Sequence, residues 1–501
     1  MDRVKNISVP CAVFFLSFVC IAAFSGCQTL PSAKASPSVE KQDSNIFLER
    51  IRTLNFASHA TGSVFADINN DGILDLVVSG SEDSRGRKNS LTMVKGPDLL
   101  GNQIQHEYSK DAINTIPAVA DRNKNDDIEI YYANDIGEIR GVRADLYSWP
   151  VHTVNPNCKI HSSHTIADFT EDGYPELTLG TNNGQLLVYD LYSKKLLWVE
   201  TVGGSINTSP AIGDVDKDND IDIVVGNEDG KVYAFEGSNR SVLWTFNTRA
   251  EIRSDVAIGD IDSDNQQEIV VGNNNGYMFC IDGITGKEEW SAHKYSGFGK
   301  EIISPITLAD VDNDGLTEIL AGTQAGRLLI YSSHGELMLD KDLGGRIPGS
   351  ILVADVNSDG IMEILAVSVQ EGKSMIYILN GKAGKIGQIL YQWPLVGEIK
   401  SHPALADVDK DCRMELSIGP HILRFKGGGE IRWGQFGGDA FNTSFLDNAL
   451  KYGVDPVEYV KNPDSVAYVP VKKLEKIWKK DNVLAGSVNF ADVDNDSNLD
   501  I

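Results

Sequence analysis

The chain has 501 residues, of which 42% are hydrophobic, and its 71 acidic residues outnumber 45 basic ones to give a formal net charge of −26. A surface this negative repels phosphate backbones, which excludes nucleic acid as an expected partner. The length exceeds what a single hydrophobic core normally fills, so we expect one large domain with additional segments.

The first 27 residues have the pattern of an export signal. Two basic residues, Arg3 and Lys5, precede an apolar run that ends in Phe-Ser-Gly-Cys at Cys27. We therefore expect residues 1–27 to be a signal peptide, with an uncleaved membrane anchor as the alternative. The ending resembles the signal of bacterial lipoproteins, which implies that Cys27 carries lipid, although Phe24 stands where that family usually has Leu.

Residues 28–45 are rich in Ser, Pro, Ala and Lys and contain few side chains to bury. Such a composition predicts a flexible tether between a membrane and the folded part, which would begin near Ile46. The lipoprotein resemblance implies an extracytoplasmic location, either periplasmic or at the cell surface, with the lipid in a bacterial membrane. Gln28 after Cys27 is compatible with sorting to the outer membrane.

An eleven-residue pattern recurs nine times along the rest of the chain. It reads small, Asp, apolar, Asp or Asn, any, Asp, Gly or Asn, two of any type, Asp or Glu, aliphatic, as in GDVDKDNDIDI. The first eight copies begin 45 to 54 residues apart, and 85 residues separate the eighth from the ninth. A steady period of this length is typical of the four-stranded blade of a β-propeller.

Each repeat also contains four strand signals, for example TSPAIGD before the pattern, DIVVGN after it, and then KVYAFE and SVLWTFNT. Links such as NEDGK and TQAGR place Asn or Gly where tight hairpins need positive φ. We therefore predict an all-β propeller of four-stranded antiparallel blades over residues 46–447, with eight blades and seven as the alternative. Tryptophans that recur in the last strand of the repeats are expected to pack between adjacent blades: Trp149, Trp198, Trp244, Trp290, Trp393 and Trp433.

The C-terminal part departs from the period. Residues 448–473 are polar and read as a linker, and residues 474–501 resemble the start of the first repeat. We expect this last segment to begin a further repeat or a second propeller that stops at Ile501. The alternative is that the tail closes the first blade by strand exchange.

The repeated pattern offers only oxygen ligands, at positions 1, 3, 5 and 9 counted from its first Asp, which suits a hard cation and excludes a soft metal. Hydrogen-bonded turns without metal are the alternative, but several carboxylates in one turn repel one another unless a cation lies between them. We therefore predict calcium ions in most of the loops, in preference to magnesium. The expected ligands are Asp67, Asn69, Asp71 and Asp75; Asp121, Asn123, Asn125 and Glu129; Asp168, Thr170, Asp172 and Glu176; Asp214, Asp216, Asp218 and Asp222; Asp260, Asp262, Asp264 and Glu268; Asp310, Asp312, Asp314 and Glu318; Asp355, Asn357, Asp359 and Glu363; Asp407, Asp409, Asp411 and Glu415; and Asp492, Asp494, Asp496 and Asp500.

The loops are not equivalent in charge. Those that begin at Asp214, Asp260 and Asp310 each present four carboxylates, whereas the loop at Asp121 presents two. Because formal charge raises calcium affinity, the middle repeats should fill first and the second repeat last. Cys412 stands at the turn position of the eighth loop, where Gly or Asn is expected.

These loops and their spacing resemble the FG-GAP or VCBS repeats of integrin α-subunit propellers and of many bacterial surface proteins. The resemblance implies calcium ions that brace the hairpins on one face while partners bind the other. The segments GKVYAFEGSNRSVLW and IDGITGKEEW also resemble pyrroloquinoline-quinone-type propeller repeats.

We therefore expect a membrane-anchored scaffold that binds a protein or glycan ligand in adhesion. Candidate partner-binding residues lie in the connections opposite the calcium loops: Arg253, Tyr295, Phe298, Lys300, Arg346 and His402. One alternative is a polysaccharide lyase-like propeller enzyme, for which the sequence carries no catalytic motif and only the His161 and His164 pair as a candidate. The other is a periplasmic assembly lipoprotein.

Overall fold

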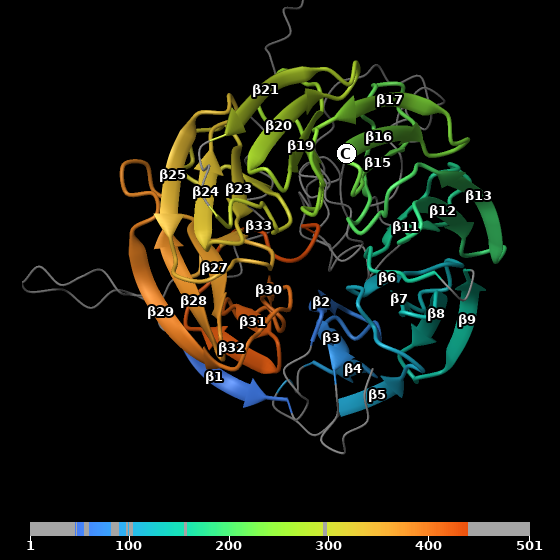
Figure 1. Cartoon of the computed structure of the whole chain (residues 1–501). Helices are drawn as coiled ribbons and strands as arrows, with labels where there is room; N and C mark the ends of the chain where they lie inside the picture. Colours follow the sequence, from blue (N-terminus) through green and yellow to red (C-terminus); the bar gives the residue numbers. More distant parts are fainter. Residues whose placement is uncertain are drawn as a thin grey trace, which may run out of the picture. The chain divides into compact units, whose positions relative to one another are not determined.

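The computed structural model describes residues 46–438, apart from 47, 55–59, 82–89, 97–98, 100–103, 155–157 and 294–297. Within these residues the chain forms eight antiparallel sheets arranged as a ring, which is an eight-bladed β-propeller without helices (Figure 1). The prediction of eight four-stranded blades is thereby confirmed. The expected signal peptide, tether, linker and ninth loop lie outside the described residues, as does Tyr295.

The first four blades follow one another in chain order. Their strands are β2 (Gly62–Ala66), β3 (Asp75–Ser81), β4 (Ser90–Val94) and β5 (Ile104–Tyr108); β6 (Ala118–Ala120), β7 (Glu129–Ala133), β8 (Glu138–Arg143) and β9 (Ser148–Thr153); β10 (Thr165–Ala167), β11 (Glu176–Gly180), β12 (Gln185–Asp190) and β13 (Lys195–Thr201); and β14 (Ala211–Gly213), β15 (Asp222–Gly226), β16 (Lys231–Glu236) and β17 (Val242–Asn247).

Blades 5 and 6 follow the same order, whereas blades 7 and 8 each take a strand from outside their own repeat. Their strands are β18 (Ala257–Gly259), β19 (Glu268–Gly272), β20 (Tyr277–Asp282) and β21 (Glu288–His293); β22 (Thr307–Ala309), β23 (Glu318–Gly322), β24 (Arg327–Tyr331) and β25 (Leu337–Asp342); β26 (Leu352–Ala354), β27 (Glu363–Gln370), β28 (Lys373–Asn380), β29 (Ile389–Val396) and β33 (Ile431–Trp433); and β30 (Ala404–Ala406), β31 (Glu415–Ile418), β32 (His421–Phe425) and β1 (Leu48–Thr53).

Burial within a blade follows the strand sequence. In blade 4 the inner strands AIG and DIVVG are buried along their whole length, whereas the outer strand VLWTFN has exposed and partly buried positions. Continuous apolar runs suit strands that are covered on both faces by the neighbouring blades. Hence the hydrophobic core is a ring of clusters between adjacent blades, such as the one that joins blade 4 to blade 5.

Tryptophans of the outer strands connect one blade to the next. The Nε1–H groups of Trp198, Trp244 and Trp290 donate to backbone carbonyls of the following blade, at 3.0, 2.6 and 2.8 Å. A Cβ at Gly286 would lie 2.5 Å from the Trp244 ring, so only glycine leaves room for this packing. The predicted packing between adjacent blades is confirmed at these three positions.

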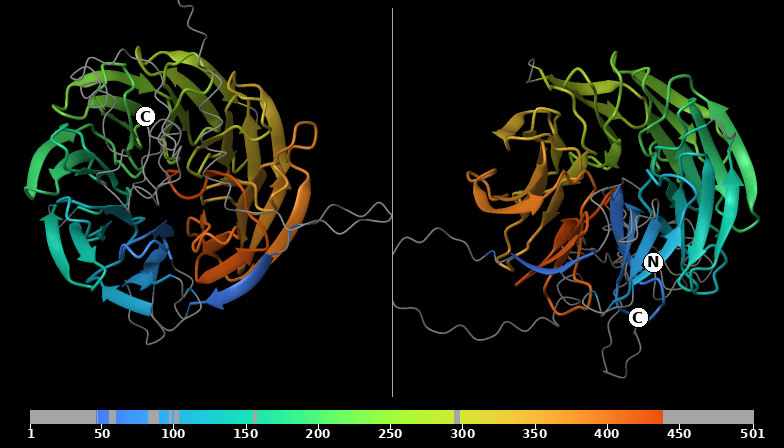
Figure 2. Two further views of the ribbon diagram at one scale, coloured as in Figure 1. Left: turned by 180° about the vertical axis from the view of Figure 1, so that it is seen from behind. Right: turned by 60° about the horizontal axis from the view of Figure 1, so that its bottom comes forward.

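The N-terminal strand closes the ring. Strand β1 pairs antiparallel with β32, with Leu48 opposite Phe425, and so supplies the outer strand of blade 8. In Figures 1 and 2 the blue β1 lies beside the orange strands of the last repeat. Because this outer position is already taken, Trp433 does not lie in a fourth strand of blade 8, as its place in the repeat predicted.

Trp433 instead belongs to β33, a fifth strand on the inner edge of blade 7, where it pairs with Val353 of β26. The residues that follow continue past the next two blades. The N–H of Leu405 in blade 8 donates to Gly434 O at 2.7 Å, and the N–H of Phe65 in blade 1 donates to Gln435 Oε1 at 3.3 Å. This segment joins blades 7, 8 and 1 near the centre of the ring. Across the described chain no helix has the length and apolar character needed to cross a bilayer.

Candidate cation-binding loops

We number the loops by blade, from loop 1 at Asp67 to loop 8 at Asp407. Each loop joins the inner strand of its blade to the second strand, so all eight lie at the same edge of the sheets. In every loop positions 4 and 6 have positive φ, between 54° at Glu171 and 89° at Gly315. The turn at position 6 was predicted from Gly and Asn, but position 4 was missed because Lys, Glu, Ser and Asn all occupy it.

Two hydrogen bonds recur in every loop and hold its backbone. The first Asp accepts the N–H of position 6, at distances from 2.7 Å in loop 1 to 3.2 Å in loop 6. The side chain at position 5 accepts the N–H of position 7. These are the bonds of Asx turns, and they shape each loop without any ion.

The carboxylate at position 9 is buried in all eight loops. One of its oxygens accepts the N–H of position 2, at 2.7 to 3.2 Å. Burial raises its pKa throughout, to about 7 for Glu318 and about 8 for Glu268, and to about 9 for Asp222, where nearby acidic charges add to the rise. A buried carboxylate among other carboxylates is costly unless a proton or cation compensates it.

Carboxylate oxygens lie within 4.8 Å of one another in at least four loops, which follow one another along the chain. The groups are Asp168, Asp172 and Glu176; Asp214, Asp216 and Asp218; Asp260, Asp262 and Glu268; and Asp310, Asp312 and Glu318. A further group joins Asp218 to Asp220 and Glu236, two residues that the sequence pattern did not single out. Glu236 lies on the third strand of its blade, directly opposite Asp222, so only the strand register reveals it.

Some ligand oxygens are buried without a hydrogen-bond partner. They are Asp222 Oδ1 at position 9 of loop 4 and, at position 3, Asn123 Oδ1, Asp312 Oδ1 and Asp409 Oδ1. Asp222 is completely buried. Because a buried charged oxygen without a partner costs several kcal/mol, loop 4 fits a cation on this ground as well as on its ligand chemistry.

In other loops the second oxygen of position 9 has a partner from the protein. Asp75 Oδ1 accepts the N–H of Gly96 at 2.9 Å in loop 1, and Glu363 Oε1 accepts from Asn357 at 3.0 Å in loop 7. In loop 2, Glu129 Oε1 accepts from Arg122 Nε at 2.9 Å. The loops therefore share a backbone and differ in what surrounds their carboxylates.

Neighbouring loops also touch through position 4. Asn70 of loop 1 donates to Asp126 O in loop 2, and Asn313 of loop 6 donates to Gly360 O in loop 7 at 3.2 Å. In loop 7, Ser358 instead donates to Gly428 O, next to β33. These contacts connect parts of the ring of loops along one face.

The predicted partner-binding residues do not form one cluster. Arg253 pairs with Glu251 at 2.7 Å, and Phe298 is 98% exposed. His402 is drawn inward, where it accepts the N–H of Ser350 at 3.2 Å and burial lowers its pKa to about 4. Its position follows from the bridge between Gly62 and His402 that joins blades 1 and 8. Lys300 lies in the connection to blade 6 and is partly buried.

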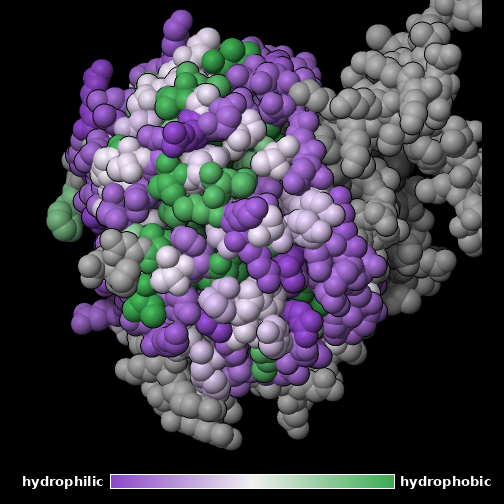
Figure 3. Space-filling model, turned by 90° about the vertical axis from the view of Figure 1, so that its right-hand side faces the viewer, coloured by the Kyte–Doolittle hydropathy of each residue, from purple (hydrophilic) through white to green (hydrophobic). Residues whose placement is uncertain are grey.

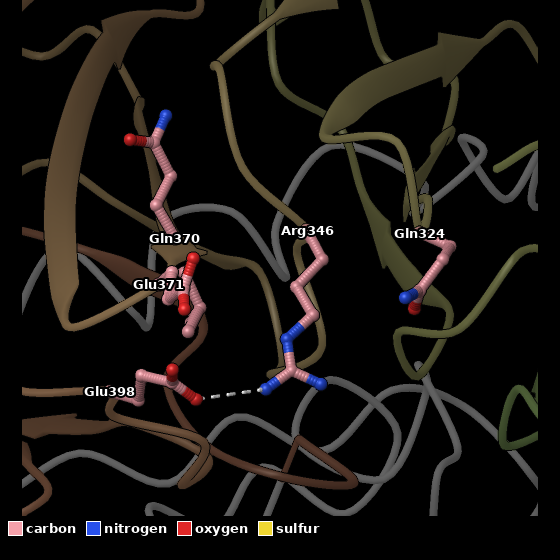
Figure 4. A pocket seen from close by; sticks show the side chains of 6 residues that line it. Gln324, Arg346, Gln370, Glu371 and Glu398 are labelled. Atoms are coloured by element: carbon pink, nitrogen blue, oxygen red, sulfur yellow. Dashed lines mark ion pairs between the residues drawn. The ribbon is translucent and has the colours of Figure 1, made fainter.

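Arg346 lines a pocket of about 360 Å³ together with Gln324, Gln370, Glu371 and Glu398. In Figure 4 its guanidinium points toward Glu398, and the two groups are 3.7 Å apart. The lining residues come from hairpins and connections of blades 6 and 7 at the edge opposite the loops. This pocket is polar and charged, and it suits a polar partner group.

The rim of blades 2 to 4 is a different surface. Figure 3 shows hydrophobic areas among hydrophilic ones on this side of the ring. Exposed apolar side chains here include Leu196 and Leu197 at the start of β13 and Val242 at the start of β17.

The two candidate histidines do not share a site. His164 is fully buried and donates through Nε2 to Tyr131 O at 2.7 Å, while His161 lies 3.5 Å from Asp135 at the surface. Their separation agrees with the alternation of side chains along an extended segment.

One family model matches part of the repeat region. Residues 172–375, which run from blade 3 into blade 7, match the family model of the outer membrane protein assembly factor BamB. That stretch is shorter than half of the chain. No curated protein matches the sequence.

Among solved structures, the chain is similar to BamB from Moraxella catarrhalis, with a TM-score of 0.52 and 13% identity over 76% of this chain and 97% of that one. It is similar to the V. cholerae biofilm matrix protein Bap1, with a TM-score of 0.56 and 12% identity over 79% and 94% of the two chains. It is also similar to Sqt1 of Saccharomyces cerevisiae, with a TM-score of 0.56 and 13% identity over 76% and 100%. At these identities the likeness shows the propeller fold.

Proposed function

We propose that this protein is an extracytoplasmic propeller scaffold that binds protein partners and is braced by calcium ions. The observation that carries the proposal is the convergence of carboxylates in loops 3 to 6, within the blades where the BamB family model matches. We infer a periplasmic assembly lipoprotein, anchored to the outer membrane through Cys27. This role takes the place of adhesion as the main interpretation.

Calcium fits the donor set better than other common cations. The loops offer carboxylate, amide and hydroxyl oxygens, and calcium accepts six to eight oxygens in flexible geometry, whereas magnesium requires a strict octahedron. Positions 1, 3, 5 and 9 of a loop would hold the ion, which would supply positive charge between the carboxylates. Its role would be structural, because an ion bound only to the native loop stabilises the folded ring.

Protein partners would bind at the edge opposite the loops. This edge carries the exposed Phe298, the Arg346 pocket and Arg253, which are residue types that often dominate binding energy at interfaces. A propeller can vary these connections without disturbing its core, because the connections lie outside the strands. We therefore assign partner binding to these connections and bracing to the loops.

Site-specific cross-linking in cells tests the assignment. A photo-cross-linking residue would replace Phe298 in the full-length lipidated protein, and the matched control would replace Glu171, which lies at the opposite edge in loop 3. Outer-membrane proteins or their assembly machinery cross-linked from position 298 and not from 171 would support the proposal. Equal products from both positions, or none from 298, would overturn it.

Glycan binding is a second candidate function, favoured by one observation. Tyr174 and Tyr192 stack with ring centroids 4.0 Å apart, and Lys124 Nζ lies 5.0 Å from the Tyr174 ring. An exposed aromatic pair with a neighbouring cation can contact the face of a sugar ring. Glycan-array binding that is lost in Tyr192→Ala and kept in Tyr147→Ala would favour this function over protein assembly.

A further inference from the structure

The residue that faces position 9 across the second and third strands changes charge around the ring. Blades 3, 4 and 5 place an acid there: Asp190 opposite Glu176, Glu236 opposite Asp222, and Asp282 opposite Glu268. Blade 8 places Arg424 opposite Glu415. Side chains directly opposite on antiparallel strands lie on the same face with their Cβ atoms about 5 Å apart. This one position can therefore deliver either charge to the loop.

In blade 8 the guanidinium of Arg424 lies among the loop carboxylates. Its Nε donates to Glu415 Oε1, and its Nη2 is 3.9 Å from Asp409 Oδ2. The Arg424 side chain is only 15% exposed and Glu415 is fully buried. Arg413 also pairs with Asp411. Three of the four expected ligands of loop 8 therefore have a guanidinium partner.

In blade 2 a guanidinium also pairs with the carboxylate at position 9, but it comes from the loop itself and not from the third strand. Arg122, at position 2 of the loop, donates from Nε to Glu129 Oε1 at 2.9 Å, and the Trp149 ring lies 5.4 Å from its guanidinium carbon. The cross-strand residue of this blade, Arg143, instead pairs with Asp145 at 2.7 Å. The remaining ligands of loop 2 include two neutral amides, so one guanidinium balances much of its charge.

We propose that Arg424 in blade 8 and Arg122 in blade 2 are built-in cations, so that these two loops fold without a divalent ion. This inference rests on the proposed function, because it assumes that loops 3 to 6 bind calcium. A divalent ion added to loop 8 would face the Arg424 charge on the same carboxylates, and this repulsion opposes binding. The two guanidiniums of loop 8, Arg413 and Arg424, offset about half of the charge of its four carboxylates before any ion arrives.

Arg432 shows that a nearby guanidinium is not sufficient. It contacts Asp310 Oδ2 at 3.0 Å and Asn313 Oδ1 at 2.7 Å in loop 6. Neither position 3 nor position 9 of that loop, Asp312 and Glu318, has a contact with it among the described interactions. Loop 6 therefore keeps its carboxylate cluster and stays among the ion-binding loops.

Two measurements on the tether-free propeller test the inference: melting temperature in chelator and the number of bound calcium ions. Arg424→Met should lower the melting temperature in chelator by about 5 °C, because it leaves a buried carboxylate unpaired. Saturating calcium should restore stability in this variant with one additional bound ion. Arg424→Lys should lower the melting temperature in chelator by less. Arg253→Met is the matched control for the loss of one positive surface charge.

Two further variants separate failure of the inference from failure of the proposed function. Asp216→Asn in loop 4 should remove one bound ion, whereas Asp409→Asn in loop 8 should remove none. Loss of an ion in Asp409→Asn would overturn the inference and leave calcium bracing intact. If the parent protein binds no calcium, the proposed calcium bracing is wrong. The role of Arg424 is then tested by the melting temperature in chelator alone. An unchanged melting temperature in Arg424→Met would overturn the inference as well.

Discussion

Loops 4 and 8 present four carboxylates each at positions 1, 3, 5 and 9, yet their surroundings have opposite charge. Asp222 of loop 4 faces Glu236, and burial together with nearby acids raises its pKa from 3.8 to about 9. Glu415 of loop 8 faces Arg424, and burial raises its pKa from 4.5 to about 7, while the hydrogen bond from the Val408 N–H and the nearby Arg424 act against the rise. Acid count within a loop therefore does not decide its demand for a cation.

In blades 4 and 8 the third strand of the blade brings a charged side chain to the loop carboxylates. The loop backbone is the same in both blades, with the same Asx-turn bonds. The main difference is the side chain opposite position 9, which is Glu236, 14 residues after Asp222, in blade 4 and Arg424, 9 residues after Glu415, in blade 8.

Removal of calcium should have the largest effect. At a hundredfold excess of free ion over Kd, each occupied site stabilises the fold by about 2.7 kcal/mol, so several sites together dominate stability. We expect the melting temperature of the tether-free propeller, measured by calorimetry, to fall by more than about 10 °C in chelator. An unchanged melting temperature at low ionic strength would show that hydrogen-bonded turns alone hold the loops, and loops 4 and 8 would then behave alike.

Neutralising position 9 should have opposite consequences in the two loops. Glu415→Gln leaves Arg424 buried without its anion and should cost about 3 kcal/mol both in calcium and in chelator. Asp222→Asn should cost stability in calcium, because a ligand charge is lost. It should increase stability in chelator, because the pKa of about 9 means that Asp222 must take up a proton when the chain folds at neutral pH, and an amide does not have this cost. Denaturant unfolding gives the free energy of unfolding of each variant in calcium and in chelator. If both variants changed the free energy of unfolding in chelator in the same direction, the different roles assigned to loops 4 and 8 would be contradicted.

Substitution of the ligand at position 3 should cost more stability in a loop that holds a calcium ion than in a loop that does not. Asp312→Ala in loop 6 should cost about 1 to 3 kcal/mol in saturating calcium, because it breaks an occupied site. Asn123→Ala in loop 2 should cost less, since Arg122 already balances Glu129 there. Unfolding experiments in calcium compare the two variants. A larger loss for Asn123→Ala would favour turns held by hydrogen bonds over ion-filled loops.

The smallest effect is expected from moving the charge of blade 8 into blade 4. Glu236→Arg should remove one bound calcium ion while changing stability in chelator by no more than about 1 kcal/mol, because the new guanidinium takes the place of the ion. Equilibrium dialysis gives the ion count, and Glu236→Gln is the matched control that should weaken the site without filling it. Retention of the full ion count in Glu236→Arg would show that the third strand does not control the loop.

The repeat architecture was readable from the sequence because its determinants are local. A loop of eleven residues contains its own ligand positions and turn residue, and the strands around it have short apolar runs bounded by Asn and Gly. These features predicted four-stranded blades, the place of each loop and the packing of Trp198, Trp244 and Trp290. The positive φ at position 4 escaped prediction because the bonds of the turn, and not the residue type, impose it.

Only the tertiary structure decided how the ring closes and which charges meet. Strand β1 completes blade 8 through pairs nearly the whole domain apart in sequence, such as Leu48 with Phe425, and this leaves β33 to run along the inner edge of blade 7. Likewise, Glu236 and Arg424 reach their loops through strand register, which a one-residue slip would reverse. Local sequence determines the shape of each loop, whereas long-range strand pairing determines its electrostatic environment, because charge acts through space and not along the chain.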